Sequence, residues 1–208
     1  MAWSDSLERA NDVFGKKLKY YTSAYPSTMY SYFNNLQGMI INTSEDELFR
    51  IYSWDTNMGG TMHDFENVFQ YKYKEQTYSI LDTAKDESDY VYLYSNLYTL
   101  KAGNKSYYLA VFDGIFSSHD MGEGIRVFSI ENGKLVDTKL IKTQSGLHNK
   151  LYYDYDLFSI PGNLKDADIR YNLTLKIISL PVIVDKGKVT NRRITYKFTG
   201  QYFERVKN

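Results

Sequence analysis

Two histidines in the chain each precede an aspartate, and this pairing can do acid–base or metal chemistry. His63 comes directly before Asp64, and His119 comes directly before Asp120. The chain has only three histidines, so a histidine-rich metal site would need all of them from distant segments. We therefore interpret both pairs as polar turn residues. His63 follows a glycine turn close to Trp54, and we expect these two residues to be candidate ligand-binding residues.

The turn before His63 has part of the pattern of a calcium-binding loop. An EF-hand loop places oxygen ligands at positions 1, 3, 5 and 12. Asp55, Asn57 and Glu66 fit positions 1, 3 and 12, whereas Gly59 stands at position 5 and supplies no ligand. The flanking segments also have strand patterns instead of helical ones. A calcium site at Asp55, Asn57 and Glu66 is thus one interpretation, and the favoured one is a tight turn with glycine at positive φ. No other cofactor is expected.

Tyrosines alternate with aliphatic residues between positions 90 and 98. The tyrosines share one parity: Tyr90, Tyr92, Tyr94 and Tyr98. Residues of one parity lie on one face of a strand. If the aliphatic face enters the core, the tyrosine face can stack against sugar rings or lie under a protein partner. The alternative is burial beneath the N-terminal helices or an ordinary cross-strand aromatic ladder, and burial is the commoner outcome.

The motifs of common catalytic sites are missing from the chain. There is no His-Glu-x-x-His run, Gly-x-Ser-x-Gly elbow or phosphate-binding loop. Cysteine is absent, which excludes disulfides, thiolate ligands and cysteine nucleophiles. Gly122-Glu-Gly124 is interpreted as a turn. Carboxylates are abundant, and two at a suitable separation could serve a glycosidase. The sequence therefore favours a protein that is not an enzyme, with a carboxylate-dependent hydrolase as the alternative.

Length and charge narrow the class of protein further. The chain has 208 residues, with 25 basic and 25 acidic side chains. This balance argues against nucleic-acid binding through bulk charge. The 43% share of hydrophobic residues excludes intrinsic disorder. No apolar run approaches the roughly 20 residues of a transmembrane helix, and the first residues lack the basic start and apolar core of a signal peptide.

Helical periodicity is confined to the first part of the chain. Residues 5–21 are expected to form an amphipathic helix, because apolar residues recur there at three- and four-residue spacing. These residues define one stripe: Leu7, Ala10, Phe14, Leu18 and Tyr21. A second, shorter helix is expected over residues 27–36, after Pro26 and before Gly38.

From residue 39 onward the period changes to two, as in Ile125 and Val127, which alternate with Arg126 and Phe128. About ten to twelve strands follow without helices between them, so they should pair antiparallel. We expect a mainly β fold with N-terminal helices. Residues 1–38 form a helical N-terminal cover and residues 39–208 an antiparallel β domain, together one globular domain. A β-sandwich and a partly closed β-barrel both fit this pattern.

Residues 49–63 read FRIYSWDTNMGGTMH, and residues 194–203 read ITYKFTGQYF. The first block resembles one found in uncharacterised exported or envelope proteins of Gram-negative bacteria, and the second resembles the end of such a protein. The resemblance implies a β-rich protein of the periplasm or cell envelope whose signal peptide has been removed, with the cytoplasm as the alternative. It implies no activity and assigns no residue a role. We therefore expect a non-catalytic binding or structural module for a carbohydrate or an envelope protein partner.

Overall fold

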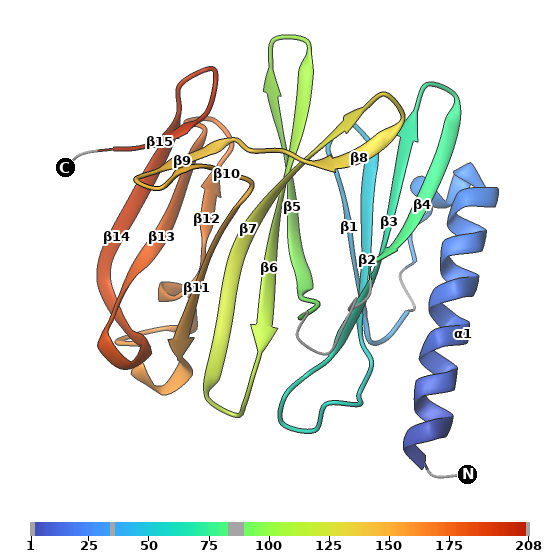
Figure 1. Ribbon diagram of the computed structural model, residues 1–208, viewed down its shortest axis with the longest axis horizontal. Helices are drawn as coiled ribbons and strands as arrows, with labels where there is room; N and C mark the ends of the chain where they lie inside the picture. The colour runs from blue at the N-terminus through green and yellow to red at the C-terminus, as the bar shows by residue number, and fades with distance from the viewer. Residues whose placement is uncertain (1–2, 34–35, 83–89, 207–208) are drawn as a thin grey trace.

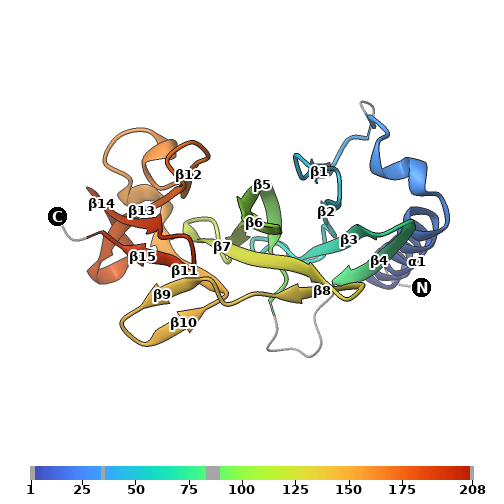
Figure 2. The same cartoon turned by 90° about the horizontal axis from the view of Figure 1, so that it is seen from above.

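The strands form three sheets that lie beside one another as layers (Figures 1 and 2). The computed structural model describes residues 3–33, 36–82 and 90–206. Sheet A contains β1 (Met39–Thr43), β2 (Phe49–Asp55), β3 (Phe65–Tyr73) and β4 (Gln76–Asp82), in that order. Sheet B has the order β11-β7-β6-β5, and β8 pairs with β7. Its strands are β5 (Leu93–Ala102), β6 (Lys105–Ile115), β7 (Asp120–Glu131), β8 (Lys134–Asp137) and β11 (Lys150–Asp156).

Sheet C has the order β10-β9-β15-β14-β13-β12. Its strands are β9 (Ile141–Thr143), β10 (Gly146–His148), β12 (Arg170–Asn172), β13 (Ile177–Val184), β14 (Lys188–Phe198) and β15 (Phe203–Arg205). Short 3-10 turns lie in the segments next to these strands: η2 (Leu157–Ser159), η3 (Leu164–Asp166) and η4 (Asp185–Gly187).

Sheet B lies between sheets A and C, and helix α1 (Trp3–Ala24) covers the outer face of sheet A (Figure 2). The core between sheets A and B is mostly aromatic and includes Phe49 and Phe112. The core between sheets B and C is richer in aliphatic residues, such as Val111 and Ile178. Because both faces of sheet B are covered, residues 108–112 of β6 are all buried. The central sheet therefore lacks the alternation of buried and exposed residues that a sheet with one solvent-exposed face shows.

The expectation of a mainly β, antiparallel fold with an N-terminal helix is confirmed. Of the two architectures that the sequence left open, the stacked sheets form a sandwich, and none of the described sheets closes on itself. The described residues contain more strands, β1–β15, than the ten to twelve expected. The surplus comes from strands such as β9, β10 and β12, which have three residues each and are too short to show a period. One pairing, between β15 and β9, is parallel.

Helix α1 packs on sheet A with a face that shares Leu18 with the predicted stripe but also includes Gly15 and Thr22. Gly15 and Thr22 are buried, whereas Phe14 and Tyr21 are 41% and 50% exposed. Gly15 permits a close approach of the helix to the sheet, since a Cβ atom there would lie 3.1 Å from Leu81 Cδ1. The predicted stripe is therefore confirmed only in part. Leu18 packs against the sheet and the Phe14 ring meets that of Trp54 at 5.1 Å, whereas Tyr21 lies outside the packed face.

Polar contacts also hold α1 with Gly15 and Thr22 towards sheet A. The indole N–H of Trp54 donates to Asn11 Oδ1 at 3.2 Å, and the Thr22 hydroxyl donates to Ser79 Oγ at 2.8 Å. Hydrophobic periodicity detects neither a glycine contact nor hydrogen bonds of this kind. For this reason the pattern found the helix but only part of the face by which it docks.

The second predicted helix, over residues 27–36, does not form. A 3-10 turn, η1 (Pro26–Met29), ends where that helix should continue, and residues 34–35 lie outside the described residues. Arg50 explains why η1 does not continue as a helix. Its guanidinium Nη1 donates to the carbonyl oxygens of Thr28 and Met29 at 2.6 and 2.8 Å. Its Nη2 donates to the carbonyl oxygen of Ser31 at 2.8 Å. These carbonyls would otherwise accept helical hydrogen bonds.

Across residues 3–33, 36–82 and 90–206, no helix is both long and apolar enough to cross a lipid bilayer.

Candidate functional site

Several predicted ligand residues meet at one edge of the molecule, where the β2–β3 loop and the β6–β7 turn lie together (lower edge of Figure 1). The backbone N–H of His63 donates to the carbonyl oxygen of Ile115, at the end of β6, at 2.9 Å. The Tyr90 hydroxyl donates to the carbonyl oxygen of His63 at 2.7 Å and accepts from the N–H of Ile115 at 3.1 Å. These bonds hold the loop against sheet B. We call the surrounding residues the rim site: Asp55, His63, Tyr90, Tyr92, Phe116 and Tyr152.

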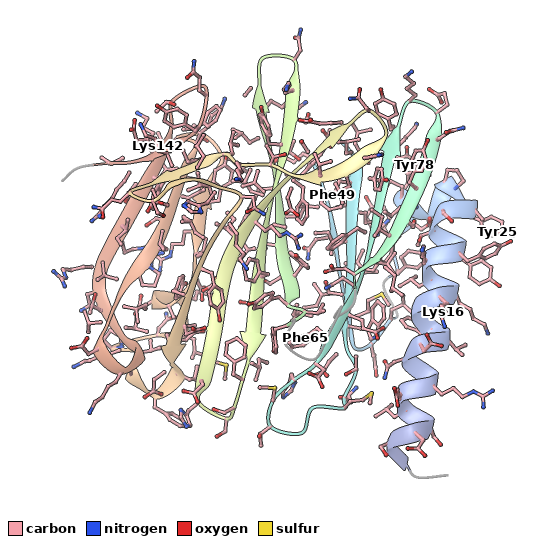
Figure 3. All side chains as sticks on the ribbon, viewed as in Figure 1. Lys16, Tyr25, Phe49, Phe65, Tyr78 and Lys142 are labelled. Carbon is pink, nitrogen blue, oxygen red and sulfur yellow. The ribbon has the colours of Figure 1, made fainter. Side chains whose placement is uncertain are left out.

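The polar part of the rim site is an aspartate–histidine pair. Asp55 Oδ2 lies 2.5 Å from His63 Nδ1, and the two side chains are 27% and 39% exposed. Asp55 Oδ1 accepts from the backbone N–H of Asn57 at 2.7 Å. The His63 ring also stacks on Phe65, labelled in Figure 3, with ring centres 6.2 Å apart. The carboxylate orients Nδ1 as the donor, so Nε2 is the nitrogen that can bind a ligand.

The loop between Asp55 and His63 forms the predicted tight turn around a small cavity. Asn57 and Gly60 have φ of 58° and 65°, which confirms that at least one glycine takes positive φ. At Gly59 a Cβ atom would lie 1.8 Å from the carbonyl oxygen of Met62, so only glycine fits. The cavity measures about 110 Å³ and is lined by Asp55, Asn57, Gly59, Gly60, Met62 and His63.

The three predicted calcium ligands do not come together. Glu66 pairs with Trp54 in the β2–β3 ladder, so its side chain lies on the α1 side of sheet A, away from Asp55. Its Oε2 is buried near Gly15, and no donor among the described residues bonds it. Burial, followed by the nearby Asp12 carboxylate, raises the pKa of Glu66. The EF-hand interpretation fails because strand alternation separates position 12 from position 1.

Aromatic rings form the other part of the rim site. The ring of Tyr92 lies 4.9 Å from that of Tyr90 and 5.7 Å from that of Tyr152, between centres. Phe116 lies 4.8 Å from Tyr90. All four side chains are half-buried, and Lys150 Nζ lies 5.6 Å from the centre of the Tyr92 ring. The rings are therefore packed against one another but still partly accessible.

Two glycines that the sequence interpretation assigned to a turn support these rings. Gly122 and Gly124 are buried residues inside β7. A Cβ atom at Gly122 would lie 2.6 Å from Tyr152 Oη and 2.7 Å from Phe116 Cε2. At Gly124 it would lie 2.1 Å from Phe112 Cζ. The turn interpretation was wrong, and the signal that could have corrected it is two glycines of equal parity next to a strand pattern, which marks close approach of other groups.

Two of the predicted ligand residues are core residues. Tyr94 is 1% exposed and accepts a hydrogen bond from Arg126 Nη1 at 3.1 Å. Burial raises its pKa. Trp54 is buried beneath α1, where its ring meets Phe14 edge-on at 5.1 Å. Neither side chain belongs to the rim site.

Tyr98 also lies apart from the rim site, and a β-bulge is the reason. The β5–β6 register shifts between Tyr94 and Asn96, so Ser95 is an additional residue. The shift turns Tyr98 towards sheet C, where its ring lies 5.3 Å from that of Tyr171. The interpretation that all four tyrosines share one face was therefore wrong, because a bulge inverts the alternation beyond it.

The remaining histidines do not join His63. His119 and Asp120 form an exposed pair in which Nδ1 and Oδ1 are 3.2 Å apart. His148 lies on β10, where its Nε2 is 2.9 Å from Ser145 Oγ. The three histidines are thus dispersed over separate loops and strands.

Two cavities lie away from the rim site. One of about 870 Å³ lies between the β9–β10 hairpin and strands β14 and β15, and Lys142 (Figure 3) and Arg193 are among its lining residues. Another of about 280 Å³ lies among the hairpin tips near Lys72 and Lys105. No rim-site residue lines either cavity.

A pair of carboxylates lies on the opposite face of sheet B, towards sheet C. Asp113 on β6 stands directly opposite Glu123 on β7. Burial raises the pKa of both side chains, that of Glu123 to about 8. Neither residue lines any of the three cavities described above.

Comparison of the chain with protein-family models, with curated proteins and with solved structures gave no match. The resemblance to exported envelope proteins stays a prediction, and the geometry of the rim site is the basis for the function proposed below.

Proposed function

We propose that the protein is a non-catalytic binding module that takes a glycan at the rim site. The observation that carries this proposal is the hydrogen bond from the Tyr90 hydroxyl to the carbonyl oxygen of His63, which places the Asp55–His63 pair beside partly exposed rings. Aromatic faces can stack on the C–H faces of sugars, while a few polar groups fix the orientation of a bound molecule.

The polar groups around the rings suit a ligand with many hydroxyls. His63 Nε2 and the Asp55 carboxylate lie on one side of the rim site. On the other side, the Tyr152 hydroxyl donates to the Asp154 carboxylate, and the Lys150 ammonium lies over the Tyr152 ring at 5.7 Å. Hydroxyl groups both donate and accept hydrogen bonds, so they can use the carboxylates and the ammonium together.

The alternative function is a hydrolase that acts on glycans or cell-envelope material through Asp113 and Glu123. The observation that favours it is the raised pKa of Glu123 beside a second carboxylate, a pattern found in acid–base pairs. Binding is the better supported function, because neither carboxylate lines a cavity described above and Glu123 is buried.

We also propose that the protein acts in the periplasm or at the cell envelope, on the strength of the resemblance of residues 49–63. Reading the codons upstream of Met1 and fractionating cells that express the natural gene test this location. Recovery of the protein in the cytosolic fraction alone would contradict it.

Calorimetric titration with a panel of neutral and acidic oligosaccharides tests the binding function. We expect at least one class to bind, and we expect His63→Ala to weaken its binding by about tenfold or more, which corresponds to about 1.4 kcal/mol. His148→Ala is the matched control, because His148 is also half-buried but lies on β10. Failure of every oligosaccharide to bind, or equal weakening by both variants, would contradict the proposal.

A further inference from the structure

Glu123 is a buried acid with hydrogen-bonding neighbours on both oxygens. It is 5% exposed, and its side chain faces sheet C because its neighbours Gly122 and Gly124 face the rim site. Glu123 Oε1 accepts from the backbone N–H of Ile169 at 2.9 Å. Glu123 Oε2 lies 2.6 Å from Tyr153 Oη. Ile169 belongs to the segment that leads into β12 of sheet C, so the carboxyl joins two sheets.

The hydroxyl of Tyr153 has a second neighbour, the carbonyl oxygen of Ala167. A tyrosine hydroxyl carries one proton, and a carbonyl oxygen can only accept a hydrogen bond. The proton of Tyr153 must therefore lie on the bond to Ala167. The contact between Tyr153 Oη and Glu123 Oε2 then needs a proton from the carboxyl group.

We infer that Glu123 keeps its proton in the folded protein at neutral pH and donates it to Tyr153, which in turn donates to Ala167. This chain of hydrogen bonds links β7 and β11 of sheet B to the segment before β12. It is a pH-sensitive closure of the seam between sheets B and C, and it does not depend on the proposed glycan site.

The charged and titratable groups around Glu123 come from five elements or segments. They are Tyr98 on β5, Asp113 on β6, Tyr153 and Tyr155 on β11, Asp168 before β12, and Arg193 on β14. Arg193 already donates to the backbone oxygens of Asp166, Asp168 and Ser179. The carboxylates of Asp113 and Asp168 repel a further negative charge at Glu123.

These surroundings support the neutral form of the carboxyl. Burial raises the pKa of Glu123 to about 8 from an ordinary value of 4.5. The hydrogen bonds to Tyr153 and Ile169 lower this pKa, and the carboxylates of Asp113 and Asp168 raise it by smaller amounts. Between these two values the unfolded chain loses this proton while the folded chain keeps it. The unfolding equilibrium constant should therefore rise by up to about tenfold per pH unit from this group. Above about pH 8 the folded protein loses the proton too, and the closure loses its first donor.

Urea denaturation at several pH values, from about pH 5 to pH 8, measures the unfolding equilibrium constant and tests this inference. Glu123→Gln keeps the pattern of the neutral acid, since an amide oxygen can accept from Ile169 and an amide N–H can donate to Tyr153. The unfolding equilibrium constant of Glu123→Gln should rise with pH less steeply than that of the wild type. The difference should be up to about tenfold for each pH unit. Glu131→Gln, an exposed change on the same strand, should match the wild type. Equal slopes for all three proteins would overturn the inference.

A second measurement decides the question if the glutamine variant does not fold. In protein labelled with carbon-13 at the glutamate carboxyls, one resonance should titrate near pH 8. Burial also raises the pKa of Glu66, so the same resonance should persist in Glu66→Gln, and its loss in that variant would overturn the inference. Titration of every glutamate carboxyl in the ordinary acidic range would overturn the inference.

Discussion

One hydroxyl group, that of Tyr90, joins two segments of the rim site. It donates to the backbone of His63 and accepts from the backbone of Ile115. Burial raises the pKa of Tyr90, so the hydroxyl keeps the proton that it donates. The residue types at His63, Tyr90 and Tyr92 indicated candidate ligand residues from the sequence, and the structure places them together.

Trp54, Tyr94 and Tyr98 were also predicted from their aromatic side chains but lie elsewhere, because burial and register decide where an aromatic side chain lies. No local pattern distinguishes Tyr94 from Tyr92, since both belong to the same alternating run. The glycines at 122 and 124 were missed for a related reason. These glycines make room for rings that belong to β6, β11 and the β6–β7 turn. The sequence of β7 alone contains none of these contacts.

At this scale Tyr94 and Tyr92 should respond differently to truncation. Tyr94→Ala removes a ring that is 1% exposed, and we expect it to lower the free energy of unfolding by roughly 3–5 kcal/mol. Tyr92→Ala removes a half-buried ring at the rim and should cost clearly less. Urea denaturation of both variants measures the difference. Equal losses would show that the two rings are equally embedded in the core.

At the scale of elements, the sequence predicted the N-terminal helix, the change to strands near residue 39 and the antiparallel pairing. These features come from local periodicity, which the sequence contains. The prediction of a helix over residues 27–36 was wrong, because Arg50 on β2 binds carbonyl groups that the helix would use. The bulge at Ser95 was missed because one additional residue leaves the composition of the strand unchanged.

The docking of α1 on sheet A depends on Gly15, and leucine substitutions at a packed and at an exposed position test this contact. Gly15→Leu places a side chain within 3.1–3.2 Å of Leu81 and Glu66, so we expect a loss of roughly 1–3 kcal/mol from overpacking. Lys16→Leu puts the same residue at the next, exposed position and should change stability by less than about 0.5 kcal/mol. Thermal unfolding of both variants measures this. A Gly15→Leu protein as stable as Lys16→Leu would show that the helix is not closely packed there.

At the scale of the whole molecule, sheet B is covered on both faces and should be the most protected layer. Amides of β6 and β7 exchange with solvent only when the stack opens, so their exchange should report the global free energy of unfolding. Amides of the edge strands β4 and β12 should exchange through smaller openings. Hydrogen exchange followed by mass spectrometry checks this order. Exchange from β6 as fast as from β4 would contradict the layered account.

The parallel pairing of β15 with β9 also sets an order of events during synthesis. In the described part of sheet C, β9 and β10 pair with the other strands through β15 alone. The Lys142–Glu204 ion pair that spans this contact joins residues 62 positions apart. Phe203 at the start of β15 is fully buried. The β9–β10 hairpin therefore lacks its strand partner in sheet C until the ribosome has added β11 to β15. Sheets A and B can assemble while the chain is still growing, whereas sheet C is completed only after residues 203–205 have emerged, by a long-range closure that is slow to form.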